Sequence, residues 1–199
     1  MAEAKQNVMT AEGLRALENQ LEEHLAKRNE IAAQIEFARG YGDLSENAEY
    51  TEAKNLQSQN EEEISRLQAL IRTAVVVSDL SLDKVAVGLT VEMEILSVEG
   101  EAANDIYDNG VLMLRGWQPG MRLVYSLVGT EEADPLNGKI SSDCDIGAGL
   151  IGKSAGETFT FVFSGNSKDP STVELRIAGI FRSGSEAADI ISADRDVVA

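Results

Sequence analysis

The sequence predicts an α+β protein in which a helical hairpin precedes a strand-rich domain. Between residues 10 and 75, mainly apolar residues recur at alternating spacings of three and four, and no proline interrupts them. This is the heptad pattern of paired helices, and we call the residues at these spacings the seam of each helix. From residue 85 the period changes to two, and glycines separate the alternating segments, as is typical of strands. The expected divisions are a hairpin domain at 1–77, a linker at 78–84, a C-terminal domain at 85–182 and an acidic tail at 183–199.

The first helix is predicted to begin after Thr10, a suitable N-cap residue whose hydroxyl can accept a hydrogen bond from the first turn. Its seam comprises Leu14, Leu17, Leu21, His24, Arg28, Ile31, Ile35 and Ala38. A second helix follows a short turn, with a seam of Tyr50, Ala53, Gln57, Asn60, Ile64, Leu67, Ile71 and Ala74. Two such helices joined by a short turn pair antiparallel, and we expect Leu21 to pack against Leu67.

The middle of the predicted hairpin is polar. Folding about the turn places Arg28 opposite Asn60 and Ile31 opposite Gln57. Polar seam residues weaken a coiled coil but fix its register. His24 is the only histidine, and its seam position favours a structural role over metal binding.

The C-terminal half is predicted to form an antiparallel sheet with one short helix. The expected strands are 90–98, 121–128, 158–163 and 173–181. The small, apolar segment 147–153 is the candidate helix. Segment 101–120 contains several apolar and aromatic residues, and we expect an additional hairpin at 106–114 packed on the sheet.

The turn between the helices contains two carboxylates, Asp43 and Glu46, after the punctuating glycines Gly40 and Gly42. One interpretation is purely structural, because an Asp N-cap followed three residues later by Glu has the spacing of a capping box. The other is that a long arm delivers two hard oxygen ligands into a deep site, where they help to hold a Mg²⁺ ion. Four residues alone do not separate these interpretations.

The wider stretch resembles a known family. The run Gly42-Asp43-Leu44-Ser45-Glu46-Asn47-Ala48-Glu49-Tyr50, with Ala38-Arg39 before it and Ala53-Lys54 after it, resembles the signature of the bacterial Gre transcript cleavage factors, and the GreA branch most closely. A second patch, from Ile140-Ser141 through Gly149-Leu150-Ile151-Gly152-Lys153, resembles the C-terminal domain of the same family. The resemblance implies an FKBP-like fold for that domain.

The resemblance also implies a function. Gre factors bind RNA polymerase, insert the hairpin through its secondary channel and stimulate the polymerase's own cleavage of backtracked RNA at the 3′ end. Asp43 and Glu46 match the family's acidic pair, and either could help to bind the second, shared Mg²⁺ or activate water. Four further residues would shape the tip: Leu44, Ser45, Asn47 and Tyr50. No cofactor of its own and no nuclease activity of its own are expected.

The resemblance implies that the C-terminal domain docks on the rim of the channel through Cys144, Asp145 and Ile146. The family usually has a Ser-Pro pair where this chain has Cys144-Asp145, and the following Gly147-Ala148-Gly149 lacks a basic residue often present there. The arms also have little clustered basic charge. Contact with the RNA 3′ segment is therefore expected to be weaker than in relatives with more basic arms.

Composition excludes several classes of function. The chain has 17 basic and 34 acidic residues, a net charge of −17 and a pI near 4.4, which argues against strong binding of free nucleic acid. One cysteine excludes an intramolecular disulfide and a zinc site built on cysteines. No signal peptide or membrane span is recognised, so a cytoplasmic location is expected. The protein is expected to be a monomer.

Two alternatives remain open at this stage. One is a regulator of the same fold that occupies the channel and tunes the polymerase without cleavage, which the altered docking segment and the 101–120 insertion favour. The other is an unrelated coiled-coil adaptor. A prolyl isomerase is disfavoured, because the C-terminal domain has few aromatic residues to line a proline pocket.

Overall fold

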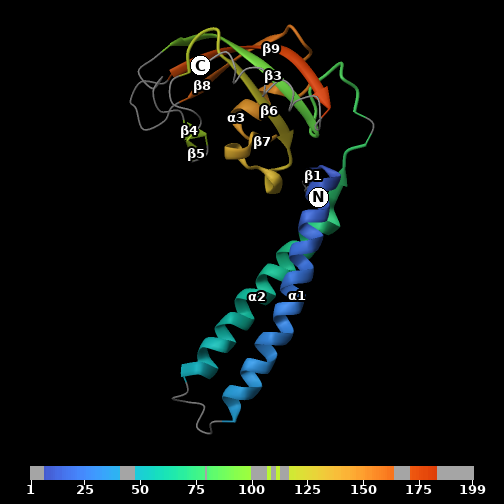
Figure 1. Ribbon diagram of the computed structural model, residues 1–199, viewed down its shortest axis with the longest axis vertical. Helices are drawn as coiled ribbons and strands as arrows, with labels where there is room; N and C mark the ends of the chain where they lie inside the picture. Colours follow the sequence, from blue (N-terminus) through green and yellow to red (C-terminus); the bar gives the residue numbers. More distant parts are fainter. Residues whose placement is uncertain are drawn as a thin grey trace, which may run out of the picture. The chain divides into compact units, whose positions relative to one another are not determined.

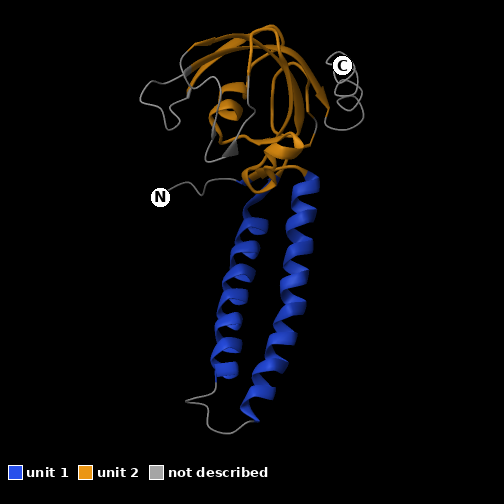
Figure 2. Ribbon diagram, turned by 60° about the vertical axis from the view of Figure 1, so that its left-hand side comes forward, with its two compact units in different colours: residues 1–7, 11–75 blue, residues 8–10, 76–199 orange. Residues whose placement is uncertain are grey.

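The computed structural model describes residues 7–40, 48–78, 80–99, 107–108, 111–112, 117–163 and 171–182. The chain divides into two compact units (Figure 2). The first comprises residues 1–7 and 11–75, and the second comprises residues 8–10 and 76–199. Residues 8–10, which we expected in the N-terminal domain, therefore group with the C-terminal unit.

The first unit is the predicted antiparallel pair of helices, α1 (Ala11–Arg39) and α2 (Ala48–Thr73), which lie side by side in Figures 1 and 2. The buried faces of both helices follow the predicted seams, except at Arg28, which is exposed. The buried seam residues are Leu17, Ile31, Ile35 and Ala38 on α1, and Ala53, Asn60, Ile64 and Leu67 on α2. In the described part of the chain, neither helix contains an apolar stretch able to span a bilayer.

The polar layer of the hairpin differs from the prediction in its partners. Asn60, only 5% exposed, pairs with His24 rather than with Arg28. Its side-chain Nδ2 donates to the His24 carbonyl at 3.0 Å, so its Oδ1 accepts from His24 Nδ1 at 2.8 Å. The short amide reaches the neighbouring backbone, whereas the long Arg28 side chain extends to the exposed carboxylate of Glu61.

The second unit is built on a five-stranded sheet with the order β7-β6-β3-β9-β8 (Figure 1). Its strands are β3 (Leu89–Glu99), β6 (Arg122–Val128), β7 (Lys139–Ser141), β8 (Thr158–Phe163) and β9 (Ser171–Arg182). All neighbours pair antiparallel except β6 and β7, which are parallel. The four predicted strands are confirmed within two residues at each end. The sequence analysis missed β7, because three residues are too few to show alternation.

One face of this sheet and the short helix α3 (Asp145–Leu150) enclose the core. Alternate residues of β3 point into it, and Ile146 and Leu150 of α3 pack in the same cluster. Trp117 is 2% exposed and meets the Phe161 ring edge-on, with 6.2 Å between ring centroids. The predicted helix exists but begins two residues earlier than expected, at Asp145.

The insertion contains the expected hairpin. Strand β4 (Tyr107–Asp108) pairs antiparallel with β5 (Val111–Leu112). Its packing on the sheet stays a prediction, because most of segment 101–116 lies outside the described residues. The tail at 183–199 lies outside them as well.

Residues 8–10, just ahead of α1, belong to the second unit. A two-stranded sheet pairs β1 (Asn7–Met9) with β2 (Ala74–Val76). Thr10 donates from its backbone N–H at 2.8 Å, and from its hydroxyl, to the carboxylate of Glu132 in the 3-10 helix η2 (Thr130–Glu132). A second 3-10 helix, η3 (Pro135–Asn137), leads into β7. Both bonds from Thr10 to Glu132 lie within the second unit.

We predict that His24→Leu destabilises the hairpin by about 1–3 kcal/mol, because Asn60 Oδ1 stays buried without a donor. Changing both residues, His24→Leu with Asn60→Leu, should restore most of that loss by making the layer apolar. Urea unfolding followed by the helical circular dichroism signal measures both. Equal midpoints for the single and double variants would contradict a direct bond between these side chains.

We also predict that Gly147→Ala destabilises the C-terminal unit by about 3 kcal/mol or more. A Cβ at Gly147 would lie 2.0 Å from the Ser141 carbonyl oxygen, so α3 could no longer rest against β7. The matched control is Gly152→Ala, where a Cβ meets nothing within 4 Å and only the φ of +79° costs about 1 kcal/mol. Fluorescence of Trp117, the single tryptophan, reports unfolding. Equal losses of stability in Gly147→Ala and Gly152→Ala would refute the close packing of α3 against Ser141.

Candidate functional site

The sequence places the candidate site in the connection between α1 and α2. Asp43, Leu44, Ser45, Glu46 and Asn47 lie outside the described residues. The structure describes the two helix ends that this connection joins, together with Tyr50 on the first turn of α2. The structural surroundings of the site are therefore the residues at the end of α1 and at the start of α2.

An aromatic contact joins the two helix ends. The guanidinium carbon of Arg39, the last residue of α1, lies 6.0 Å from the centre of the Tyr50 ring. The half-buried Tyr50 also packs against the apolar cluster of Ile31, Ile35 and Ala53. Tyr50 thus anchors the first turn of α2 on α1, next to the connection that contains the acidic pair.

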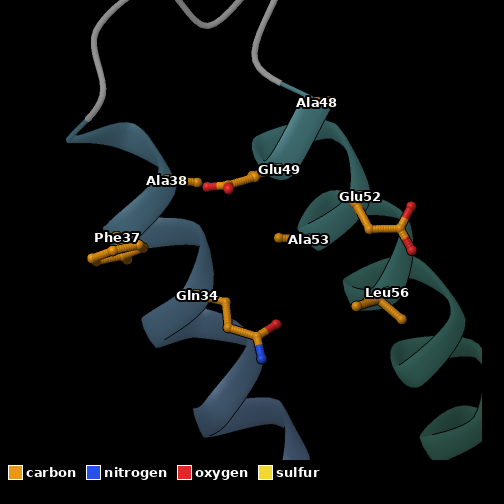
Figure 3. A pocket seen from close by; sticks show the side chains of 8 residues that line it. All are labelled: Gln34, Phe37, Ala38, Ala48, Glu49, Glu52, Ala53 and Leu56. Carbon is orange, nitrogen blue, oxygen red and sulfur yellow. The ribbon is translucent and has the colours of Figure 1, made fainter.

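A pocket of about 600 Å³ lies between the arms at this end of the hairpin (Figure 3). It is lined by Gln34, Phe37, Ala38, Ala48, Glu49, Glu52, Ala53 and Leu56. Three of these residues are alanines, whose small side chains leave the space between the helices unfilled. Figure 3 shows the Glu49 carboxylate reaching from α2 towards Ala38 on α1, while the Glu52 carboxylate points away from α1.

Sequence analysis missed Phe37 and Glu49 as site residues. Phe37 is adjacent to the seam residue Ala38, and its side chain is 66% exposed although it is aromatic. A large apolar residue one position off a heptad seam is the signal that would have identified it. Glu49 belongs to the family signature, but the direction of its side chain depends on how the helices pack.

Two basic residues of the arms are paired with glutamates. Arg28 pairs with Glu61, and Arg66 pairs with Glu63 at 2.7 Å. The hydrogen bonds from these arginines lower the pKa of the Glu61 and Glu63 carboxyls below their ordinary value. Among the described residues, no ion pair involves Glu49 or Glu52, and no group of three His, Cys, Asp or Glu could hold a metal ion.

The predicted docking segment is the start of α3. Cys144 is its N-cap, and its Sγ accepts a hydrogen bond from the Gly147 N–H at 3.3 Å. Cys144 and Ile146 are buried, with 6% and 1% exposure, so their side chains face the core. Of the three predicted docking residues, only Asp145 exposes its side chain.

Hydrogen bonds fix the loop that precedes α3. The Asp143 N–H donates to Ser141 Oγ at 3.0 Å, and the Thr130 hydroxyl donates to Asp143 Oδ2 at 3.1 Å. These bonds tie the loop to η2. Asp145 is therefore presented from a well-anchored segment.

Comparison with known proteins agrees with the family resemblance. Residues 7–76 match the family model described as "Transcription elongation factor, N-terminal", and residues 116–175 match "Transcription elongation factor, GreA/GreB, C-term". Transcription elongation factor GreA of Caldanaerobacter subterraneus subsp. tengcongensis is 40% identical over 160 residues, covering 79% of this chain and 88% of that protein. GreA of Clostridium perfringens is 38% identical over 181 residues, which cover 89% of this chain and 98% of that protein.

Among solved structures, the GreA factor homolog 1 (Gfh1) protein of Thermus thermophilus is similar at 21% identity, with coverage of 88% of this chain and 99% of that chain and a TM-score of 0.37. The curated relatives match this chain over most of their own length, and the family models match both of its halves. The chain therefore belongs to the GreA/GreB family of transcription elongation factors.

Proposed function

We propose that this protein binds bacterial RNA polymerase, inserts its hairpin through the secondary channel and stimulates the polymerase's own Mg²⁺-dependent cleavage of backtracked RNA. The observation with the most weight is the identity of 38–40% to proteins named GreA over 79–89% of this chain, together with the intact tip signature. In this role the protein supplies side chains to the active site of another enzyme. It works in the cytoplasm, as a monomer.

The hairpin has the dimensions for this task. The arms of 29 and 26 residues are continuous helices, each about 40 Å long at 1.5 Å per residue. An arm of two helices is narrow, so it can bring a tip into a deep channel. The paired seam and the Tyr50 anchor keep the two arms together up to the connection.

The donor set of the tip fits a hard cation. Asp43 and Glu46 would share the polymerase's second Mg²⁺, which in a two-metal site helps to activate the attacking water. A carboxylate can also accept a proton from that water. Because the remaining ligands belong to the polymerase, cleavage is a property of the complex.

The second unit would dock on the polymerase through the start of α3. Asp145 is the exposed side chain of that segment, whereas Cys144 and Ile146 hold the helix in place from the core. Contact with the RNA 3′ end would involve little basic charge, since the arm has little concentrated basic charge beyond Lys27, Arg28 and Arg39, and Arg28 is paired with Glu61.

One observation favours a second candidate function, a channel regulator without cleavage. Asp145 stands where the family usually has proline, and it exposes a carboxylate on the docking segment. An altered contact between this segment and the polymerase could hold the hairpin in a position that blocks the channel. A transcript cleavage assay on a stalled polymerase complex separates the two functions.

We predict that Asp43→Asn and Glu46→Gln each abolish stimulation of transcript cleavage while polymerase binding persists. Asn and Gln can make the same capping hydrogen bonds as Asp and Glu, so thermal stability should change by well under ~1 kcal/mol. Both remove the charged oxygen that Mg²⁺ prefers, and added Mg²⁺ should partly restore cleavage. Cleavage at the level of the unmodified protein by the double variant would reduce the acidic pair to a helix cap.

We predict that Asp145→Arg weakens polymerase binding by about tenfold, because it reverses a charge at the docking segment. The fold should persist, since the side chain is exposed and the lost helix-dipole interaction is worth less than about 1 kcal/mol. Glu99→Arg makes the same charge change at an exposed position on β3 and is the control. Equal effects of the two substitutions would assign the loss to net charge instead of docking.

A further inference from the structure

We propose that strand β8 pairs antiparallel with the same strand of a second copy of this chain. The strand lies at one end of the five-stranded sheet, next to β9 (Figure 1). The product is a weak dimer in which the sheets of two copies join edge to edge. The proposed function does not enter the argument, because the monomer that would act on polymerase is the dilute form of the same protein.

The first argument is the direction of the backbone groups of β8. The Glu157 carbonyl, just before the strand, accepts from the Ile177 N–H of β9 at 2.9 Å. Backbone groups of successive residues point to opposite sides of a strand, so those of Phe159 and Phe161 also face β9. The N–H and C=O groups that face away from β9 belong to Thr158, Thr160 and Val162. We call these groups the β8 edge, and none of the described strands pairs with β8 on that side.

The second argument is that β8 lacks the features that protect edge strands. Natural edge strands are short, charged, bulged or interrupted by proline. In contrast, β8 has six residues, none of them charged or proline, and its register with β9 contains no shift. The opposite end of the sheet differs, because β7 has three residues and Lys139 exchanges two backbone hydrogen bonds of 2.9 Å with Asp134. Among the described strands of this sheet, β8 alone presents a long and regular edge.

The third argument is that β8 is complementary to itself. A twofold axis at Thr160 places this residue opposite its own copy, and it places Thr158 opposite the second copy's Val162. In that register every outward N–H meets a C=O, since such facing residues exchange both bonds. The facing side chains are β-branched and uncharged, so they pack across the strands without repulsion. The side chain of Val162, which is 57% exposed, would gain a neighbour.

A second copy is the occupant that the sequence of β8 favours. A strand from another protein would need the same length and an equally uncharged sequence, which a second copy supplies. The contact is small, because a single pair of strands buries less than the roughly 1,200 Å² of a typical specific interface. Each copy also has a net charge of −17, so two copies repel each other. We therefore expect a dissociation constant on the order of 100 μM, which decreases as salt screens the repulsion.

The test is sedimentation equilibrium of the full-length chain over a concentration series that extends above this dissociation constant, at low and at high salt. We expect a dimer that forms with increasing concentration and is stronger at high salt. Amide hydrogen exchange over the same series identifies the contact. The N–H groups of Thr158, Thr160 and Val162 should become protected as the dimer forms, whereas those of Phe159 and Phe161 should be protected throughout.

Thr160→Lys should weaken association by at least tenfold, because two lysines then face each other across the twofold axis. The substitution also lowers the net negative charge of each copy, which by itself would strengthen association. Leu136→Lys is the matched control, since it adds the same charge in η3, where the side chain is 88% exposed, and it should not weaken association. Thr160→Pro removes one N–H of the β8 edge and should abolish the dimer. Fluorescence of Trp117 during thermal unfolding shows whether each variant keeps its fold.

Four results would overturn the inference. The first is a protein that stays monomeric over the whole series at both salt concentrations. The second is protection of the β8 edge at every dilution, which would mean that the same chain covers it. The third is association that Leu136→Lys abolishes and Thr160→Lys leaves unchanged, which would place the contact at η3. The fourth is protection of the β8 edge that appears only after polymerase is added. None of these results depends on transcript cleavage, so the inference and the proposed function fail separately.

Discussion

The close approach of α1 and α2 along a single narrow seam is the constraint on which the hairpin depends. Each arm is polar outside its seam, so neither helix would bury enough apolar surface alone. The buried bond between Asn60 and His24 interrupts the apolar seam. Such a bond can form in only one register, so it sets which residues reach the end of the hairpin together.

The size of the seam side chains then decides whether the space between the two helices is filled or open. Where Ile64 and Leu67 face the partner helix, the seam is filled and buried. Towards the connection, Ala38 and Ala53 replace these large side chains, and a pocket opens. Glu49 and Glu52 line the pocket at that end, and their charge suits contact with cationic protein surfaces better than contact with nucleic acid.

The C-terminal unit depends on a similar close approach. Gly147 lets α3 lie directly against the Ser141 carbonyl, and Ile146 and Leu150 then enter the core. This placement leaves Asp145 as the outward side chain of the segment. The proposed docking surface is thus a consequence of how tightly a six-residue helix packs on the sheet.

The sequence by itself determined the elements that follow from residue spacing: both seams, the four longer strands, the hairpin of the insertion, and the tip signature that names the family. Only the tertiary structure decided that His24 meets Asn60, that Cys144 and Ile146 are buried, and that Glu49 reaches across a pocket beside Phe37. Spacing predicts which face a side chain occupies. Its partner depends on side-chain length and on the distance between packed elements, which only the folded chain defines.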